Sequence, residues 1–533
     1  MTSLSGRYSA ASSLHAADGW QAERLTRPSR LFGANGMRTG ADGRVYVAQV
    51  AGSQVSAIDV NSGQIETISP TGGDIVGPDD LAFDAAGNLF ATEITRGLVS
   101  MRKPNGEYRV VQGDMPCANP ITVYNGKLIA GECRIGGRIM ELSADGGPPR
   151  IILDNVPMPN AFEVGPDGKL YFPVMGTNEI WRVDLAGGEP EVVAKDLGVP
   201  DSVKFDSRGF IVSTQVASGQ VLRIDPATGE KTVLAQLAPG LDNCTFVGDR
   251  LFVSSITGEV VEITASGEVR ALVDKGLQWP LDVGVAADGS LFVVDGGFTY
   301  TLQPGGELQL VGMLFSPGFP GYCRGVASSG PGEWIVTTAN GEVSRFNVVN
   351  QQSSVIASGF DQLMGVALAD AGIVTAEYGR GRLLGIDASG EVSVLATDLA
   401  APKGVAVAAD GACYVAESAA GKVSRVSGGV AETLLDGLQQ PEGIALHQGK
   451  LFVLDIGAKT LVECDLLDGD RRVIASGLPV GAPAGAEIKL LGGVGDMCGP
   501  MGNFTGIDVA ADGTLYICGD AEGSVIALRH SGA

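Results

Sequence analysis

The sequence predicts an all-β fold, namely two six-bladed β-propellers in tandem with four-stranded antiparallel blades. The prediction rests on a recurring phrase of about 40 residues, on a tight Asp-Gly turn inside that phrase, and on 78 glycines among 533 residues. Short apolar runs joined by Gly-containing tight turns are typical of β-hairpins. Clear copies of the turn lie at residues 41–43, 166–168, 287–289, 409–411 and 511–513.

The number of repeats sets the architecture. The chain holds twelve copies of four short strands each, which is the strand content of a propeller blade. One ring usually has four to eight blades, so two rings of six are the simplest division. We expect an N-terminal tail at 1–20, a first propeller at 21–265, and a second at 266–533 with an inserted loop at 478–502. That loop covers a functional site or is a solvent loop.

Two segments that resemble outer strands predict how the rings close. They lie at residues 21–26 and 268–273, each ahead of the first blade of its half. A ring without an open edge needs every strand to be paired. We therefore expect each propeller to begin with the outer strand that closes its own last blade.

Composition and charge exclude several classes of protein. The net charge of -24 disfavours binding to nucleic acid and to anionic membranes. No window of 18 apolar residues and no leader-like N-terminus is present, so we expect a cytoplasmic protein. The eight cysteines have no metal-site or disulfide-framework spacing and are expected to be free thiols.

One position per blade carries the strongest functional signal. It is the residue just before the innermost strand, where six side chains converge around one end of the channel. In the first half this position reads Asn35, Asp79, Asn119, Asn160, Asp201 and Asp242. Converging Asn and Asp oxygens suit a hard divalent cation, with Ca²⁺ fitting best and Mg²⁺ or Mn²⁺ as alternatives.

The second half provides an internal control. Asn and Asp also suit turns for local reasons, but turn geometry would then select them in both halves. In the second half the same position reads Leu281, Arg324, Met364, Lys403, Glu442 and Thr505. The sequence therefore predicts the metal site in the first propeller only.

A second layer lies at the end of each blade's second strand. It reads Gln49, Glu93, Glu132, Val174, Gln215 and Ser255 in the first half, and Asp295, Thr338, Glu377, Glu417, Asp455 and Gly519 in the second. Such buried acids commonly tie one blade to its neighbour. Glu93 and Glu132 are reserve candidates for a ligand or proton acceptor. In the second half the three charged ring residues are expected to meet the layer's acids in a plugging salt-bridge network, or to bind a charged ligand.

Histidine is nearly absent, so acid–base chemistry at the ring would use carboxylates or metal-bound water. The three histidines are His15, His447 and His530, outside the blades of the first half. A metal could polarise an ester or lactone carbonyl while a ring aspartate takes a proton from water or attacks as a nucleophile. The catalytic candidates are Asp201, as the base, with Asp242 and Glu93.

Three phrases resemble the senescence-marker-protein/gluconolactonase family of calcium-dependent six-bladed propeller hydrolases. They are GPDGKLYF at 165–172, GQVLRIDPATGE at 219–230 and QQPEGIAL at 439–446. The resemblance implies a divalent metal at the channel mouth, with Asn119, Asn160 and Asp201 matching the family's Asn, Asn and Asp. Asn35 stands where the family has a first-blade Glu, and Asp79 or Asp242 could restore that charge.

The leading hypothesis is a divalent-metal-dependent hydrolase of an ester-like bond, probably a lactone, acting on a small-molecule substrate. Two alternatives stay open at this stage. One is a lyase or isomerase that uses the same metal to stabilise an enolate. The other is a non-enzymatic double propeller that binds or scaffolds partners and holds structural calcium.

Overall fold

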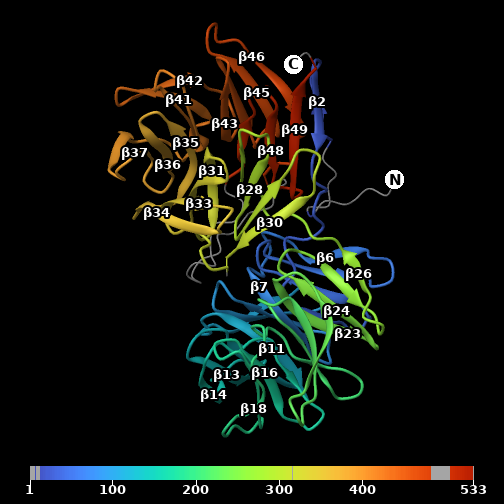
Figure 1. Cartoon of the computed structure of the whole chain (residues 1–533). Coiled ribbons are helices and arrows are strands. Elements are labelled where there is room, and N and C mark those ends of the chain that lie inside the picture. The colour runs from blue at the N-terminus through green and yellow to red at the C-terminus, as the bar shows by residue number, and fades with distance from the viewer. Residues whose placement is uncertain (1–6, 8–12, 315, 482–503, 532–533) are drawn as a thin grey trace. The chain divides into compact units, whose positions relative to one another are not determined.

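The computed structural model describes residue 7 and residues 13–314, 316–481 and 504–531. Its strands form twelve antiparallel sheets, eleven of four strands and one of five. Figure 1 shows them arranged radially in two rings of six blades, and the chain divides into two compact units. The predicted fold class, two six-bladed propellers, is confirmed. We number the blades 1–6 in the first propeller and 7–12 in the second.

The first propeller is the unit Arg30–Gly276, and each of its blades is built from four consecutive strands. Blades 1–3 are β3 (Met37–Thr39), β4 (Val45–Gln49), β5 (Gln54–Ile58), β6 (Ile65–Ser69); β7 (Pro78–Phe83), β8 (Leu89–Glu93), β9 (Leu98–Arg102), β10 (Tyr108–Gln112); β11 (Ala118–Tyr124), β12 (Lys127–Glu132), β13 (Gly137–Leu142), β14 (Arg150–Val156). Blades 4–6 are β15 (Glu163–Val164), β16 (Leu170–Val174), β17 (Glu179–Val183), β18 (Glu191–Ala194); β19 (Lys204–Phe205), β20 (Ile211–Thr214), β21 (Gln220–Ile224), β22 (Lys231–Gln236); β23 (Leu241–Val247), β24 (Arg250–Ser255), β25 (Val260–Ile263), β26 (Val269–Val273).

Burial along the strands explains why the blades stack face to face. Second strands such as β8 are buried at every residue, whereas fourth strands such as β22 are exposed at most residues. Apolar clusters fill the space between blades; one between blades 3 and 4 includes Ile129, Phe162 and Phe172. The inner strands are thus held rigidly around the channel, and this positions the residues that begin them.

Blades 6 and 1 close the first ring without sharing a strand. The Ser254 hydroxyl donates to the Asn35 carbonyl at 2.8 Å, and the Thr39 hydroxyl donates to the Phe246 carbonyl at 2.7 Å. At the periphery, the Arg250 guanidinium donates to the Val60 carbonyl at 3.1 Å. Side-chain hydrogen bonds therefore do here what a shared strand does in the other ring.

The second propeller combines residues up to Ser29 with residues from Leu277 onward. Blades 7–9 are β27 (Asp282–Val285), β28 (Leu291–Asp295), β29 (Phe298–Leu302), β30 (Leu308–Met313); β31 (Cys323–Gly330), β32 (Glu333–Thr338), β33 (Glu342–Asn347), β34 (Gln352–Ser358); β35 (Leu363–Ala369), β36 (Gly372–Glu377), β37 (Arg382–Ile386), β38 (Val392–Ala396). Blade 10 is β39 (Pro402–Val407), β40 (Cys413–Glu417), β41 (Lys422–Ser427) and β42 (Val430–Leu435), with a 3₁₀ turn η1 (Ser418–Ala420).

The last two blades take strands from both ends of the chain. Blade 11 is β43 (Pro441–His447), β44 (Lys450–Asp455), β45 (Thr460–Asp465) and β46 (Arg471–Ser476), with β1 (His15–Ala16) added outside β46. Blade 12 is β47 (Ile507–Val509), β48 (Leu515–Gly519) and β49 (Ser524–His530), and its fourth strand is β2 (Trp20–Arg24). The blue β2 and the red β49 lie side by side in Figure 1.

This pairing corrects the predicted closure and the predicted domain boundaries. The segment at 21–26 is a strand, but it closes the last blade of the second propeller, and the segment at 268–273 is the regular fourth strand of blade 6. The physical reason is that β26 already occupies the edge of β25, so the open edge is the one on β49. The first propeller therefore spans 30–276 instead of 21–265, and the expected tail at 1–20 contains β1 and the start of β2. The predicted insertion at 478–502 lies outside the described residues beyond residue 481.

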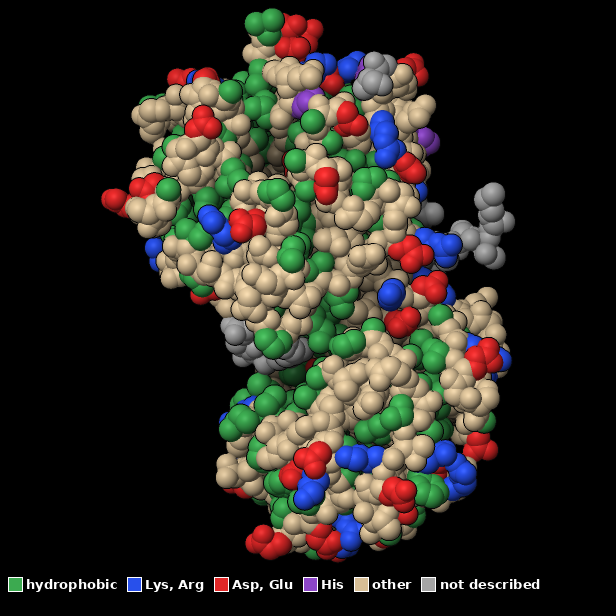
Figure 2. Space-filling model, viewed as in Figure 1, with side chains coloured by type: hydrophobic (Ala, Val, Ile, Leu, Met, Phe, Trp, Pro, Cys, Tyr) green, Lys and Arg blue, Asp and Glu red, His purple; other side chains and the backbone are tan. Residues whose placement is uncertain are grey.

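Surface and cysteines agree with the composition. On the face drawn in Figure 2, Asp and Glu side chains are interspersed with Lys and Arg. The seven cysteines that the structure describes are free thiols. No helix within the described ranges is long and apolar enough to span a membrane.

Candidate functional site

The six Asn/Asp residues predicted for the first ring do begin the inner strands. Each backbone is anchored to its own blade; the Asn35, Asn160 and Asp201 amides, for example, donate to carbonyls of the second strand at 2.9, 3.1 and 3.0 Å. Five of the six residues are buried, and Asn35 is half-buried. Rigid backbones therefore present short polar side chains at one level of the channel.

Two pairs of ring residues hydrogen-bond across neighbouring blades. Asn160 Nδ2 donates to Asp201 Oδ2 at 2.9 Å, and Asn35 Nδ2 donates to Asp242 Oδ2 at 3.1 Å. The carbonyl oxygens of both amides accept backbone N–H groups, from Ala161 for Asn160 and from Val50 for Asn35. These two residues thus orient the carboxylates and turn nitrogen, not oxygen, toward the ring.

The three ring aspartates repel one another. Burial, and next the Asp80 charge, raise the pKa of Asp79 to about 7. Burial and the Asp79 charge raise the pKa of Asp201 well above its usual range, and burial, Asp201 and Asp79 do the same for Asp242. Carboxylates from blades 2, 5 and 6 therefore share one low-dielectric site, which favours a bound cation or a bound proton.

A polar plug, which the sequence analysis missed, closes the channel one to three residues deeper. Its centre is Arg38 of blade 1, which donates to the carbonyls of Leu81 and Ile121 at 2.9 and 2.8 Å and to Glu163 at 3.0 Å. The plug consists of Arg38, Asp80, Glu163, Lys204 and Asn243.

The plug joins all six blades. Lys204 of blade 5 lies 3.6 Å from Glu163 of blade 4, and Asn243 of blade 6 donates to Asp80 of blade 2 at 3.4 Å. Arg38 links blade 1 to blades 2, 3 and 4 through the contacts already given. The signal for the plug is in the sequence, because its residues follow the ring position by one or three residues. The ring site is therefore a blind mouth.

A thiol and a thioether border the ring. The Cys133 thiol donates to Met175 Sδ at 4.0 Å, and Asn160 Nδ2 approaches the same sulfur at 3.2 Å. Burial raises the pKa of Cys133, and the charges of Asp201 and Asp79 raise it further. The side of the mouth near blades 3 and 4 is thus neutral and polarisable. No motif marked these two residues in the sequence.

The second-layer residues serve mainly as structural ties. Glu93 accepts from the Val76 amide, from Arg96 and from the Tyr108 hydroxyl, each at 2.9 Å, and Glu132 is paired with Arg134 and Arg138. The same role recurs in both propellers, where second-layer side chains accept backbone N–H groups of the segment leading into their own blade: Gln49, Gln215, Asp295, Glu377, Glu417 and Asp455. These ties lie within a blade, so the expected blade-to-blade role is corrected.

The plugging network expected at the second ring is reduced to one ion pair. Lys403 and Glu442 are buried and paired, and Glu442 also accepts the Thr505 amide at 2.8 Å. Arg324 donates to the Leu363 carbonyl at 3.2 Å, and burial lowers its pKa to about 10. The second-layer acids of this half are occupied by their own blades and do not reach the ring residues.

The donor set of the first ring fits a divalent cation in chemistry and in charge. Three buried carboxyl groups face one another, and among the described residues only amides donate to them. Within those ranges no three His, Cys, Asp or Glu side chains lie close enough to hold a metal. The carboxylates must therefore move together on binding, against the repulsion that separates them. Asp79, Asp201 and Asp242 would hold the ion with Asn119, and Asn35 and Asn160 would join after rotation of their amides.

Comparison with known proteins agrees with this site. Residues 10–257 match the SMP-30/Gluconolactonase/LRE-like region, so the first half of the chain, with the complete ring, belongs to this family. A search of curated proteins found no match.

Solved structures similar to this chain include three propeller enzymes. They are a streptogramin B lyase (19% identity, 51% of this chain and 94% of that one, TM-score 0.39), a virginiamycin B lyase from Staphylococcus aureus (15%, 55% and 98%, 0.38) and a gluconolactonase from Xanthomonas campestris (18%, 45% and 88%, 0.38). Each spans about half of this chain.

Proposed function

We propose that the first propeller is a divalent-metal-dependent hydrolase of an ester-like bond, most simply a lactone, with the ring as its active site. The observation that carries the proposal is the set Asp79, Asp201 and Asp242, three carboxyl groups from three blades that raise one another's pKa in a blind mouth. Such mutual perturbation is typical of functional sites. The family match over residues 10–257 supports it.

The ring residues can divide the chemistry among them. A divalent cation bound there would polarise the ester carbonyl and keep the carboxylates ionised. Asp201 is the proposed base, since Asn160 fixes one of its oxygens and leaves the other to accept a proton from water. Asp242 is held in the same way by Asn35. Cys133 and Met175 offer a neutral wall to the apolar part of a substrate.

The reserve candidate Glu93 is not part of this proposal. Its two carboxylate oxygens accept three hydrogen bonds within blade 2 and from the segment leading into it. A cytoplasmic location, expected from the sequence, stays a prediction.

The test combines metal content with turnover. Purified protein is assayed for bound metal and then for hydrolysis of a sugar-acid lactone, a simple aliphatic lactone and an aryl ester, with and without chelator. We expect chelator to abolish turnover and Asp201→Asn to lower kcat by about 10²–10⁴. Glu442→Gln changes a buried carboxylate at the same blade position of the other propeller and should leave turnover unchanged.

Two results would contradict the proposal. One is a metal-free protein whose Asp201→Asn variant stays fully active. The other is a protein in which metal raises the melting temperature but none of the three substrates is turned over; that result would favour the non-enzymatic double propeller. A metal-dependent elimination product instead of a hydrolysis product would favour the lyase.

A further inference from the structure

The second propeller contains a cavity of about 320 Å³ in its central channel. The inner strands of all six blades line it, namely β27, β31, β35, β39, β43 and β47. Its size is at the lower end of the range for small-molecule sites. It lies in the half of the chain without the Asn/Asp ring, so it is independent of the proposed active site.

The cavity exists because small residues replace the plug of the first propeller. One residue after the ring position, five of the six blades have glycine: Gly325, Gly365, Gly404, Gly443 and Gly506. Three residues after it, five blades have glycine or alanine: Gly284, Ala327, Ala367, Ala406 and Ala445. The corresponding positions of the first propeller hold Arg38, Asp80, Glu163, Lys204 and Asn243. The same blade plan therefore gives a filled channel in one ring and a hollow one in the other.

The hollow channel is closed at one end and open at the other. At the ring end lie the buried Lys403–Glu442 pair and Phe504, whose ring packs beside Gly365. Along β35 the residues pass from fully buried at Leu363 to 37% exposed at Leu368. A ligand would thus enter at the C-terminal ends of the inner strands.

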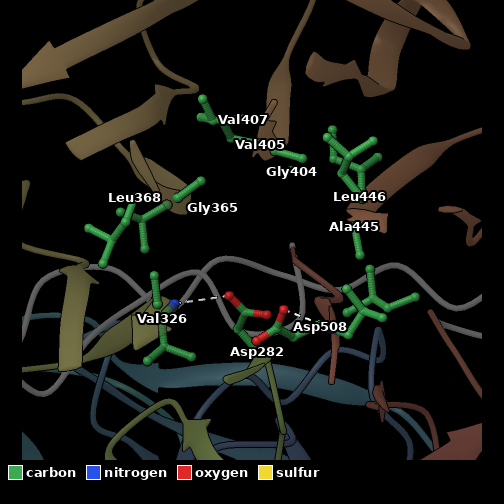
Figure 3. A pocket seen from close by; sticks show the side chains of 18 of the residues that line it. Asp282, Val326, Gly365, Leu368, Gly404, Val405, Val407, Ala445, Leu446 and Asp508 are labelled. Carbon is green, nitrogen blue, oxygen red and sulfur yellow. Dashed lines mark hydrogen bonds between the residues drawn. The ribbon is translucent and has the colours of Figure 1, made fainter. Parts of the chain in front are cut away.

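The two exceptions to the small-residue pattern are aspartates. Asp282 accepts the amides of Val283 and Val326, both at 2.9 Å, and Asp508 accepts those of Val285 and Val509, both at 2.8 Å. Figure 3 shows the two carboxyl groups beside each other at the edge of the cavity. Each oxygen accepts one amide and keeps a second lone pair for a ligand.

The rest of the lining has no charge to balance them. The other side chains that face the cavity are Val, Ala, Leu, Ile and Phe, with the hydroxyl of Ser328. Among the described residues no lysine, arginine or histidine lines it. Carboxyl groups in an apolar, concave wall attract cations and exclude anions.

We propose that this channel binds a small organic cation, with its ammonium group on Asp282 and Asp508 and its hydrocarbon part against the valine and leucine walls. A sugar acid or phosphate would be repelled, and a neutral polyol would leave its hydroxyls against apolar walls. Two carboxylates alone are a poor site for Ca²⁺, which takes six to eight oxygens.

The test uses three probes of one shape and different charge, benzylammonium, benzyl alcohol and benzoate. Binding to the full chain is followed by calorimetry and by the shift in melting temperature. We expect benzylammonium alone to bind, and Asp508→Asn to weaken it at least about tenfold, the loss expected from one charge contact. Asp512→Asn, an exposed aspartate of the same blade, is the matched control.

Filling the cavity gives a second and independent arm. Ala445→Leu adds bulk to the lining without changing charge and should abolish binding; if it lowers the melting temperature, Ser328→Leu at the half-exposed mouth does the same with less effect on the core. Equal binding of benzoate, or benzylammonium binding that survives both Asp508→Asn and the filling variant, overturns the proposal. Ca²⁺ that competes with benzylammonium and depends on Asp508 would replace it with a metal site. All these readouts are separate from lactone turnover.

Discussion

The indole of Trp20 packs edge-on against the imidazole of His530, with 5.2 Å between ring centroids and 84° between ring planes. The two residues face each other in the antiparallel pair of β2 and β49. Arg529 and Glu23 form an ion pair in the same ladder. The fourth strand of blade 12 is thus supplied from the N-terminal side of the first propeller.

The first prediction is that the two propellers depend differently on this strand. A fragment of residues 30–276 should fold alone, since its six blades are contiguous. A fragment of residues 277–533 should melt at a lower temperature or aggregate, because β49 becomes an open edge. Thermal denaturation and size-exclusion chromatography measure both. Joining residues 19–29 behind residue 533 through a short linker should restore the second fragment, and no recovery would contradict the role given to β2.

The second prediction concerns the ring charges. In chelator at pH 8, Asp79→Asn should raise the free energy of unfolding by about 2 kcal/mol, because it removes one of several buried like charges. Added Ca²⁺ should then stabilise the variant less than the wild type. Asp206→Asn is the matched control, because Asp206 is 2.8 Å from Arg223 and its loss should destabilise. Destabilisation by Asp79→Asn in chelator would show that the ring carboxylates do not repel one another.

The third prediction concerns the plug. Arg38→Met should lower the free energy of unfolding by about 3–5 kcal/mol, since it leaves Glu163 and two carbonyls without their donor. Urea denaturation of the 30–276 fragment or of the full chain measures the change. The double variant Arg38→Met/Glu163→Gln should recover part of it, and a double variant less stable than the single one would contradict the coupling.

The fourth prediction concerns pH. Burial raises the pKa of Asp508 to about 6 in the folded protein, above the value near 3.9 of an unfolded chain. A raised folded pKa means that the stabilisation is complete below pH 4 and is lost as pH rises through 6, by up to about 3 kcal/mol. The facing group is Asp282, whose raised pKa acts in the same direction. Urea midpoints at pH 5 and pH 7.5 should therefore differ less in Asp508→Asn than in the wild type, and an unchanged difference would refute this assignment.

The fifth prediction concerns the close approach of inner strands in the second propeller. A Cβ atom at Gly404 would lie 2.1 Å from the Glu442 carbonyl oxygen. Gly404→Ala should therefore cost about 3 kcal/mol of stability through overpacking. Gly113→Ala, where a Cβ meets nothing within 4 Å, should be nearly neutral. Equal melting temperatures for the two variants would contradict the packing.

Local patterns predicted the blades well and their closure poorly. The Asp-Gly turns and alternating burial mark each hairpin, because these are set by neighbours in sequence. The partner of the strand at 20–24 is set by which edge stays open after all other strands have paired. That is a property of the whole chain, and two equivalent outer strands could not be told apart by their own residues.

The ring was predictable because comparison of the two halves isolates one position. The orientation of Asn160 and Asn35 was not, since it depends on hydrogen bonds made only after folding. The plug and the hollow channel lie one to three residues from the ring position. Comparing the two halves there would have separated Arg38, Glu163 and Lys204 from the alanines of the second half.

The placement of β2 also has a consequence during synthesis. The ribosome releases this strand first, yet its partner β49 emerges about 500 residues later, which takes roughly 25–100 s at 5–20 residues per second. During that time the first propeller can fold completely while β2 waits unpaired beside it. The nascent chain thus carries an exposed strand through nearly all of translation, and the last blade is the step that protects it.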